Sequence, residues 1–173
     1  ARHILEEGPE RVATFDFDGT LFRSPQRPGW WQSGREWWSD ADSLDPPCVP
    51  EKPDASWWNG SLVRRVKQYG SDPNVYTVLL TGRKADVFSN RLHELLRQAG
   101  LDFDEVRLST GPDTLTFKTS VLQKLVDRFD SIEVWDDHPR YTRKFQSLFN
   151  KHGVRFSIKN TKTLTHEPEC EVP

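Results

Sequence analysis

The 173-residue sequence has no methionine, only two cysteines and little net charge. Cys48 and Cys170 lie far apart and outside any CxxC or Cys/His ligand spacing, so we expect neither a zinc site nor a disulfide framework. This cysteine usage favours a reducing compartment, and we predict an intracellular protein, cytoplasmic or nuclear. The formal net charge of −2 and the pI near 6.2 exclude a uniformly basic surface, so a polyanionic partner would need a local patch.

Long apolar runs are also missing. No stretch approaches the roughly 18 residues of a membrane span, and the N-terminus lacks the charged-then-apolar pattern of a signal peptide. We therefore predict no membrane association. Because the chain begins Ala1-Arg2, we expect a processed product or a piece of a larger parent protein with other domains. The pattern indicates no particular oligomeric state.

Short β-rich runs alternate with helical patterns along the chain. Five runs predict strands: Val12 to Phe15, Val75 to Leu80, Val106 to Leu108, Ile132 to Trp135 and Val154 to Ile158. Four apolar stripes at helical spacing lie between or beside them, within residues 62–69, 87–96, 121–129 and 141–149. Alternating β and α units predict an α/β fold, a five-stranded parallel sheet with helices on both faces.

One segment, residues 23–60, interrupts this alternation after the first strand. It is rich in proline and carries three tandem tryptophan pairs, Trp30-Trp31, Trp37-Trp38 and Trp57-Trp58. We expect a small Trp-rich cap or flap in which the indoles either pack into a local core or stack on nucleobases. Residues 161–173 have little apolar content and predict a loose tail or linker. The whole chain, 1–173, is expected to form a single domain.

The residues that can carry chemistry follow the predicted strands. The stretch "VATFDFDGTLF" places Asp16 and Asp18 after the first strand, and Asp136-Asp137 end the fourth. Ligands of such sheets bind outside the carboxyl ends of the strands. Carboxylates gathered there repel one another unless a cation neutralises them, and an all-oxygen site suits Mg²⁺.

Four segments in order, "DFDGT", "LLTGR", "TFKTS" and "VWDD", resemble the motifs of the haloacid dehalogenase (HAD) phosphohydrolase superfamily. The resemblance implies an HAD-like Rossmannoid fold and a phosphatase. Asp16 would be the nucleophile that forms an aspartyl-phosphate, and Asp18 the general acid and base. Thr81 would bond the transferring phosphoryl group, while Lys118 would offset negative charge.

The same resemblance implies a magnesium site. Mg²⁺ would contact Asp16, the backbone carbonyl of Asp18 and Asp136, with Asp137 a direct or water-mediated ligand. The remaining candidates would bind the substrate: Thr20, Gly82, Arg83, His138, Arg140 and Arg143. Alternatives stay open for three of them. Thr20 could cap the turn, Arg83 could pair with a helix acid such as Asp86, and His138 could simply begin a helix.

The Trp-rich insertion and "DDHPRY" are similar to the HAD domain of the fungal "Swiss army knife" RNA-repair proteins. The "TGR" and "DD" context also resembles the phosphatase half of polynucleotide kinase-phosphatases. An arginine commonly follows the two aspartates there, whereas this chain has His138, and its nearest arginine is Arg140. Residues 138–162 are basic and free of acids, so they either bind a nucleic-acid backbone or are solvated faces.

These observations predict an Mg²⁺-dependent phosphatase that removes a terminal phosphate from an RNA or DNA end during RNA repair. One alternative is an HAD phosphatase for a small metabolite or a phosphoprotein. Another is a non-catalytic module that binds nucleic acid or protein and keeps the motifs for folding.

Overall fold

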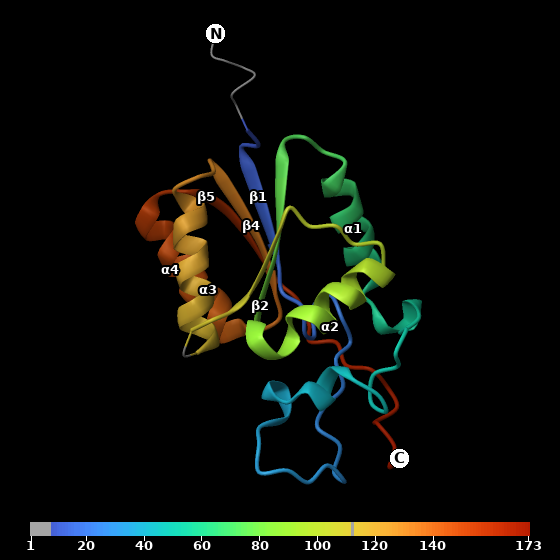
Figure 1. Cartoon of the computed structure of the whole chain (residues 1–173). Coiled ribbons are helices and arrows are strands. Elements are labelled where there is room, and N and C mark those ends of the chain that lie inside the picture. The colour runs from blue at the N-terminus through green and yellow to red at the C-terminus, as the bar shows by residue number, and fades with distance from the viewer. Residues whose placement is uncertain (1–7, 112) are drawn as a thin grey trace.

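The computed structural model describes residues 8–111 and 113–173 and contains a five-stranded parallel sheet (Figure 1). The spatial order is β3-β2-β1-β4-β5, so the first strand lies in the middle. The strands are β1 (Arg11–Phe15), β2 (Val75–Lys84), β3 (Glu105–Ser109), β4 (Ser131–Asp136) and β5 (Arg155–Asn160). The predicted parallel sheet is confirmed, and each strand overlaps its predicted run.

Within residues 8–111 and 113–173, four α-helices cover the sheet, two on each face (Figure 1). They are α1 (Gly60–Gly70), α2 (Ala85–Gln98), α3 (Thr114–Val126) and α4 (Pro139–His152). Helices α1 and α2 lie on one face, and α3 and α4 on the other. The predicted helices on both faces are therefore confirmed.

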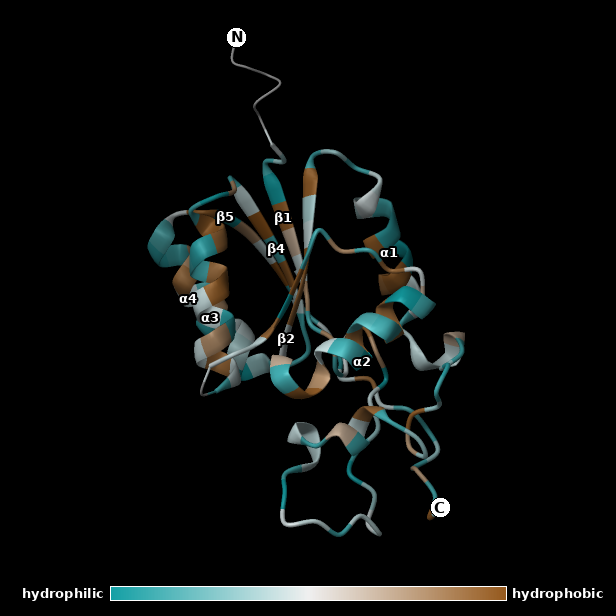
Figure 2. Ribbon diagram, in the orientation of Figure 1, coloured by the Kyte–Doolittle hydropathy of each residue, from teal (hydrophilic) through white to brown (hydrophobic). Residues whose placement is uncertain are grey.

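Alternation along β1 divides the apolar residues between two cores. Val12 packs in the core under α3 and α4, whereas Ala13 and Phe15 pack in the core under α1 and α2. Successive side chains of a strand point to opposite faces, so a strand buried on both sides is apolar almost throughout. Figure 2 shows this as brown along the central strands and on the inward sides of the helices.

The helix ends follow local signals in the sequence. The Asn59 side chain accepts a hydrogen bond from the Leu62 amide at 3.3 Å, and Asp113 accepts one from the Thr116 amide at 2.8 Å. These side chains satisfy amides that the first turn leaves without a helical partner. Helix α4 starts at Pro139 and ends at His152, and the next residue, Gly153, has a φ of 67° that suits glycine.

The insertion after β1 contains three short 3-10 helices, η2 (Trp37–Ser39), η3 (Ala41–Leu44) and η4 (Ala55–Trp57). Arg91 on α2 links this insertion to the rest of the domain by hydrogen bonds. Its guanidinium donates to the carbonyls of Leu44, Pro50 and Glu51 at 2.9, 2.8 and 3.0 Å. The insertion is thereby held beside the carboxyl ends of the strands (Figure 1).

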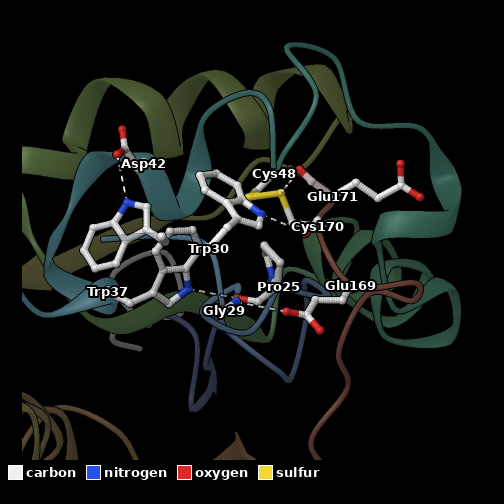
Figure 3. The surroundings of a disulfide bond; sticks show 10 residues. Pro25, Gly29, Trp30, Trp37, Asp42, Cys48, Glu169, Cys170 and Glu171 are labelled. Carbon is white, nitrogen blue, oxygen red and sulfur yellow. Dashed lines mark hydrogen bonds between the residues drawn. A yellow bond between two sulfur atoms is a disulfide. The ribbon is translucent and has the colours of Figure 1, made fainter. Parts of the chain in front are cut away.

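Cys48 in the insertion and Cys170 near the C-terminus form a disulfide (Figure 3). The expectation that these cysteines do not form a disulfide framework is therefore wrong. The two are 122 residues apart in sequence and meet only because the chain after β5 turns back along the insertion, which no local spacing reveals. With the disulfide, the cysteine-based reason for a reducing compartment is lost.

Tryptophans of the insertion surround this disulfide. Trp31 and Trp37 pack against Cys48, and the Trp30 indole donates to the Cys170 carbonyl at 3.0 Å (Figure 3). Within the described residues, the packing alternative thus holds for Trp31, Trp37, Trp57 and Trp58, which are all buried.

In residues 8–111 and 113–173, every helix is too short or too polar to span a membrane.

Candidate active site

The centre of the site lies where the strand order reverses, between β1 and β4. The Asp16 amide donates to the Trp135 carbonyl at 2.9 Å, which places Asp16 next to Asp136 at the carboxyl ends of these strands. A reversal of strand order leaves a crevice there because the connections from the two strands run to opposite faces.

Three carboxylates converge in this crevice. Asp16, Asp136 and Asp137 each offer an oxygen that lies within 4.8 Å of the others. The buried Lys118 ammonium, from α3, lies 2.8 Å from an Asp16 oxygen and 2.7 Å from an Asp136 oxygen. One cation thus faces three potential anions, which leaves an excess of negative charge.

The surroundings raise the pKa of both Asp16 and Lys118. Burial, and after it the nearby Asp136 carboxylate, raises the pKa of Asp16 well above its usual value, although Lys118 acts against this. Burial alone would lower the pKa of Lys118, but the charges of Asp16 and Asp136 outweigh it and raise that pKa. Lys118 is therefore a permanent cation, and a further positive charge would stabilise the ionised form of Asp16.

Asp18 faces a different partner, Arg83. The Arg83 guanidinium donates to Asp18 Oδ1 at 2.7 Å and to Oδ2 at 3.0 Å, and the Ser24 hydroxyl donates to Oδ1. Burial alone would raise the pKa of Asp18, but the charge and hydrogen bonds of Arg83 outweigh it and lower that pKa. Arg83, near the end of β2, thus pairs with Asp18 and not with Asp86 on α2.

The turn after Asp18 fixes the two acids. Gly19 has a φ of 75°, and a Cβ added there would lie 2.5 Å from Asp137 Oδ2. Both the backbone conformation and the close approach require glycine. Thr20 is fully buried, and its hydroxyl donates to Asp16 Oδ2 at 3.0 Å. Thr20 does not border the cavity, and its hydrogen bond orients the Asp16 carboxylate.

The end of β2 contributes Thr81, Gly82 and Arg83. Thr81 is buried, and its hydroxyl accepts a hydrogen bond from the Arg83 amide at 3.1 Å. Gly82 lies against Thr114 at the start of α3, where an added Cβ would come within 2.5 Å of Thr114 Cγ2. Gly82 and Arg83 border the cavity, whereas Thr81 lies behind its wall.

A cavity of about 580 Å³ opens above these groups. Its walls include eight of the residues predicted from sequence: Asp16, Asp18, Gly82, Arg83, Lys118, Asp136, Asp137 and His138. His138 immediately precedes α4, and its ring stacks on Tyr141 with centroids 3.8 Å apart. Arg140 and Arg143 are exposed on α4 and lie outside the wall.

Sequence patterns did not reveal four other residues of the site: Ser24, Trp38, Tyr141 and Thr163. Trp38 is 38% exposed and borders the cavity, with its ring centroid 5.5 Å from the Arg83 guanidinium carbon. The tandem tryptophans were the one signal that could have indicated it, although not which member of a pair is exposed. Ser24 and Thr163 follow no periodicity and lie in irregular segments.

The donor set fits a divalent cation. Carboxylate oxygens are preferred ligands of Mg²⁺, which is usually bound through one or two carboxylates together with water or phosphate oxygens. Asp16, Asp136 and Asp137 would hold the ion on the side of the cluster that faces the cavity. Asp18 lies outside this carboxylate group, and its side chain is bound to Arg83.

A parallel α/β sheet with an acidic triad and a lysine at the switch point defines an HAD-like domain. The match with a family model makes the assignment specific. Residues 19–171 match the HAD domain family 1 in Swiss Army Knife RNA repair proteins, and the chain belongs to this family. The matched region begins directly after the Asp16/Asp18 pair, so the pair is assigned to the site by its position in the fold.

Solved structures share the fold at low sequence identity. A chain in the Pnkp1/Rnl/Hen1 complex matches with a TM-score of 0.55 at 13% identity, over 92% of the present chain and 47% of the other. The present chain thus spans about half the length of that relative. The HAD domain of the effector protein Lem4 from Legionella pneumophila matches with a TM-score of 0.56 at 13% identity, over 93% and 91%. The acidic triad is consistent with an HAD active site.

Proposed function

We propose that this domain is a Mg²⁺-dependent phosphohydrolase that removes a terminal phosphate from a nucleic-acid end in RNA repair. The observation that carries the proposal is the contact between Asp16, Lys118 and Asp136 beside Asp137. This arrangement places one potential nucleophile among a fixed cation and two potential metal ligands. Membership of an RNA-repair family supports the substrate class.

In the proposed reaction, Asp16 attacks the phosphorus of the substrate and forms an aspartyl-phosphate. The bond from phosphorus to the bridging ester oxygen breaks, and the nucleic-acid end leaves with a free hydroxyl group once this oxygen has taken up a proton. Lys118 neutralises charge on Asp16 and on the phosphoryl oxygens, and Thr20 keeps the Asp16 carboxylate oriented. Mg²⁺ would neutralise the phosphoryl oxygens further. Thr81 would reach the phosphoryl group only after a small shift, because it lies behind the wall.

Asp18 is the candidate proton carrier. As an ionised carboxylate held by Arg83, it is suited to accept a proton from the water that hydrolyses the aspartyl-phosphate. Donation to the leaving oxygen requires that Asp18 first be protonated, which Arg83 opposes. A substrate phosphate that draws Arg83 away from Asp18 would remove this opposition.

Two surface features support a nucleic-acid substrate. Arg140, Arg143 and Lys144 are exposed on α4, whose N-terminal residues border the cavity. Trp38 presents an exposed indole on the cavity wall. A basic surface can bind the phosphate backbone, and an indole can stack on a base.

The test is phosphate release in the presence of Mg²⁺ from matched RNA oligonucleotides with a 3′- or 5′-terminal phosphate. A small aryl phosphate serves as the non-nucleic-acid substrate. Wild type is compared with Asp16→Asn and with Asp102→Asn, a control with the same charge change at an exposed position outside the site. We expect release from one RNA end, far above the aryl phosphate, that Asp16→Asn abolishes and Asp102→Asn preserves.

The other outcomes assign the alternatives. Release from the aryl phosphate alone would support the HAD phosphatase reaction. It would also show that the substrate is a small metabolite or a phosphoprotein and not a nucleic-acid end. No release from any substrate, with retained oligonucleotide affinity, would favour a binding module.

The cellular setting is part of the proposal. We propose that the domain works inside the cell, in the cytoplasm or nucleus, where the Cys48–Cys170 disulfide would be exposed to reduction, alongside other domains of a larger protein. The match to about half of a longer chain in the Pnkp1/Rnl/Hen1 complex supports the second point. Fractionation of cells with an antibody against the domain tests the first.

A further inference from the structure

After β5 the chain crosses the mouth of the active site instead of leaving it. Residues 161–170, called here the C-terminal strap, follow the DFDGT turn closely. The Thr161 amide donates to the Asp136 carbonyl at 3.0 Å, the Leu164 amide to the Gly19 carbonyl at 2.8 Å, and the His166 amide to the Arg23 carbonyl at 3.1 Å. The strap therefore contacts Asp136 of the acidic triad as well as the turn and segment that follow Asp18.

The far end of the strap is anchored to the insertion. Cys170 forms the disulfide with Cys48, and Glu169 accepts a hydrogen bond from the Gly29 amide at 3.2 Å (Figure 3). Nearer the site, the His166 ring stacks on Trp57 with centroids 3.6 Å apart. The disulfide is the one covalent link among these anchors.

Between the two ends, Thr163 contacts the triad directly. Its hydroxyl donates to Asp137 Oδ2 at 2.8 Å. The same oxygen also lies close to Gly19, where an added Cβ would be 2.5 Å from it and 3.0 Å from Thr163 Cγ2. Asp137 Oδ2 is thus in contact with both the Thr163 hydroxyl and the Gly19 backbone. A carboxylate with one oxygen fixed also has the direction of its other oxygen fixed.

We propose that Thr163 is a positioning residue that orients Asp137 for a divalent cation, and that the Cys48–Cys170 disulfide keeps Thr163 in place. The inference rests on the proposed function, in which Asp16, Asp136 and Asp137 bind Mg²⁺. Partners that orient metal ligands contribute to affinity even though they do not touch the ion. The side chain of Thr163 comes from a segment that the motifs do not include.

The disulfide makes this arrangement sensitive to thiol reductants. A dithiol reductant converts Cys48 and Cys170 to two thiols with two electrons and two protons, and the reductant itself becomes a disulfide. The strap then depends on its hydrogen bonds and on the His166 stack alone. Because the disulfide joins segments 122 residues apart in sequence, its loss lets the strap leave the site more often. Asp137 loses its Thr163 partner whenever this happens.

The test measures Mg²⁺ binding to the full chain by calorimetry, without substrate. Thr163→Val removes the hydroxyl at nearly constant volume, and Thr163→Ser restores a hydroxyl as the matched control. In oxidised protein we expect Thr163→Val to weaken Mg²⁺ binding by about tenfold, and Thr163→Ser to stay within about twofold of wild type. Reduction of wild type with dithiothreitol should weaken binding in the same direction and increase hydrogen exchange in residues 161–170.

If the disulfide acts through Thr163, reduction of the Thr163→Val protein should cause little additional loss of Mg²⁺ affinity. The Cys48→Ser/Cys170→Ser protein controls for the reductant, because its affinity should not change when dithiothreitol is added.

The outcomes separate the inference from the proposed function. If oxidised wild type binds no Mg²⁺, the proposed metal site itself is wrong. If wild type binds Mg²⁺ and Thr163→Val binds it equally well, Thr163 does not position Asp137. If Thr163→Val weakens binding but reduced and oxidised wild type agree, the disulfide has no part in it. Should reduction unfold the chain, the Thr163 variants in oxidised protein still decide the positioning role.

Discussion

The Arg83 guanidinium holds both oxygens of Asp18, with Nη2 2.7 Å from Oδ1 and Nε 3.0 Å from Oδ2. The same guanidinium donates to the Ser43 hydroxyl in the insertion. Arg83 therefore links the DFDGT turn, the end of β2 and the insertion. Since its side chain is only 2% exposed, its interactions are made away from bulk water.

Replacing Arg83 by alanine should destabilise the fold as well as the site. Removal of Arg83 leaves the Asp18 charge without its partner, and because the Asp18 side chain is 25% exposed, we expect the free energy of unfolding to fall by about 2 kcal/mol. Arg107→Ala is the control, because Arg107 pairs with Glu105 at the surface and its loss should cost less than about 1 kcal/mol. Urea unfolding measures both values. Equal losses for the two variants would show that the Arg83–Asp18 pair contributes no special stability.

Gly82→Ala should separate the end of β2 from the start of α3. The added methyl would lie 2.5 Å from Thr114 Cγ2 and 3.0 Å from Thr114 Cβ, so the Thr114 side chain would have to move. Overpacking of this kind costs about 1–3 kcal/mol. Thermal unfolding should show a lower midpoint for Gly82→Ala and a partial recovery for Gly82→Ala/Thr114→Ala. Gly70→Ala, with open space around the added Cβ, is the control. A midpoint for Gly82→Ala equal to that of Gly70→Ala would contradict the close approach.

The sheet and the chemical residues could be predicted because both depend on local patterns. Phe15 and Val12 belong to a short apolar run whose length and flanks indicate a buried strand. Asp16 and Asp136 directly follow such runs, and parallel strands bring their carboxyl ends to one edge. Strand identity therefore predicted the proximity of residues more than a hundred positions apart.

The contacts that residues of the irregular segments make could not be predicted in this way. The ion-pair alternative for Arg83 named nearby Asp86, yet its partner Asp18 lies 65 positions earlier in the chain. The pairing of Cys48 with Cys170 and the contact of Thr163 with Asp137 depend on the path of the strap. Neither the insertion nor the strap has a regular spacing of apolar residues that would predict its path. Their contacts therefore follow only from the complete fold.

If the substrate is a nucleic acid, the exposed cations near the start of α4 should contribute to binding. Arg143→Ala/Lys144→Ala should weaken oligonucleotide affinity and reduce the slope of log K against log salt by about 1 to 1.5, because each phosphate contact releases a fraction of a counterion. Arg64→Ala/Lys67→Ala removes the same charge from the exposed face of α1, away from the cavity, and is the control. Binding is followed by fluorescence anisotropy at several salt concentrations. The same slope for wild type and the α4 variant would exclude this surface from the binding site.

Magnesium should stabilise the folded chain through the acidic triad. A ligand that binds only the folded state adds about 2.7 kcal/mol to the free energy of unfolding at a free concentration of about 100 times its Kd. Asp136→Asn should lose most of this gain. Asparagine keeps the Oδ1 acceptor for the His138 amide, which lies 3.0 Å away, but removes a negative charge next to Lys118. Thermal unfolding with and without Mg²⁺, with Asp102→Asn as the control, measures the difference. A Mg²⁺-dependent increase that survives in Asp136→Asn would place the cation elsewhere on the protein. Loss of the increase in Asp136→Asn alone would assign the cation to the crevice between β1 and β4.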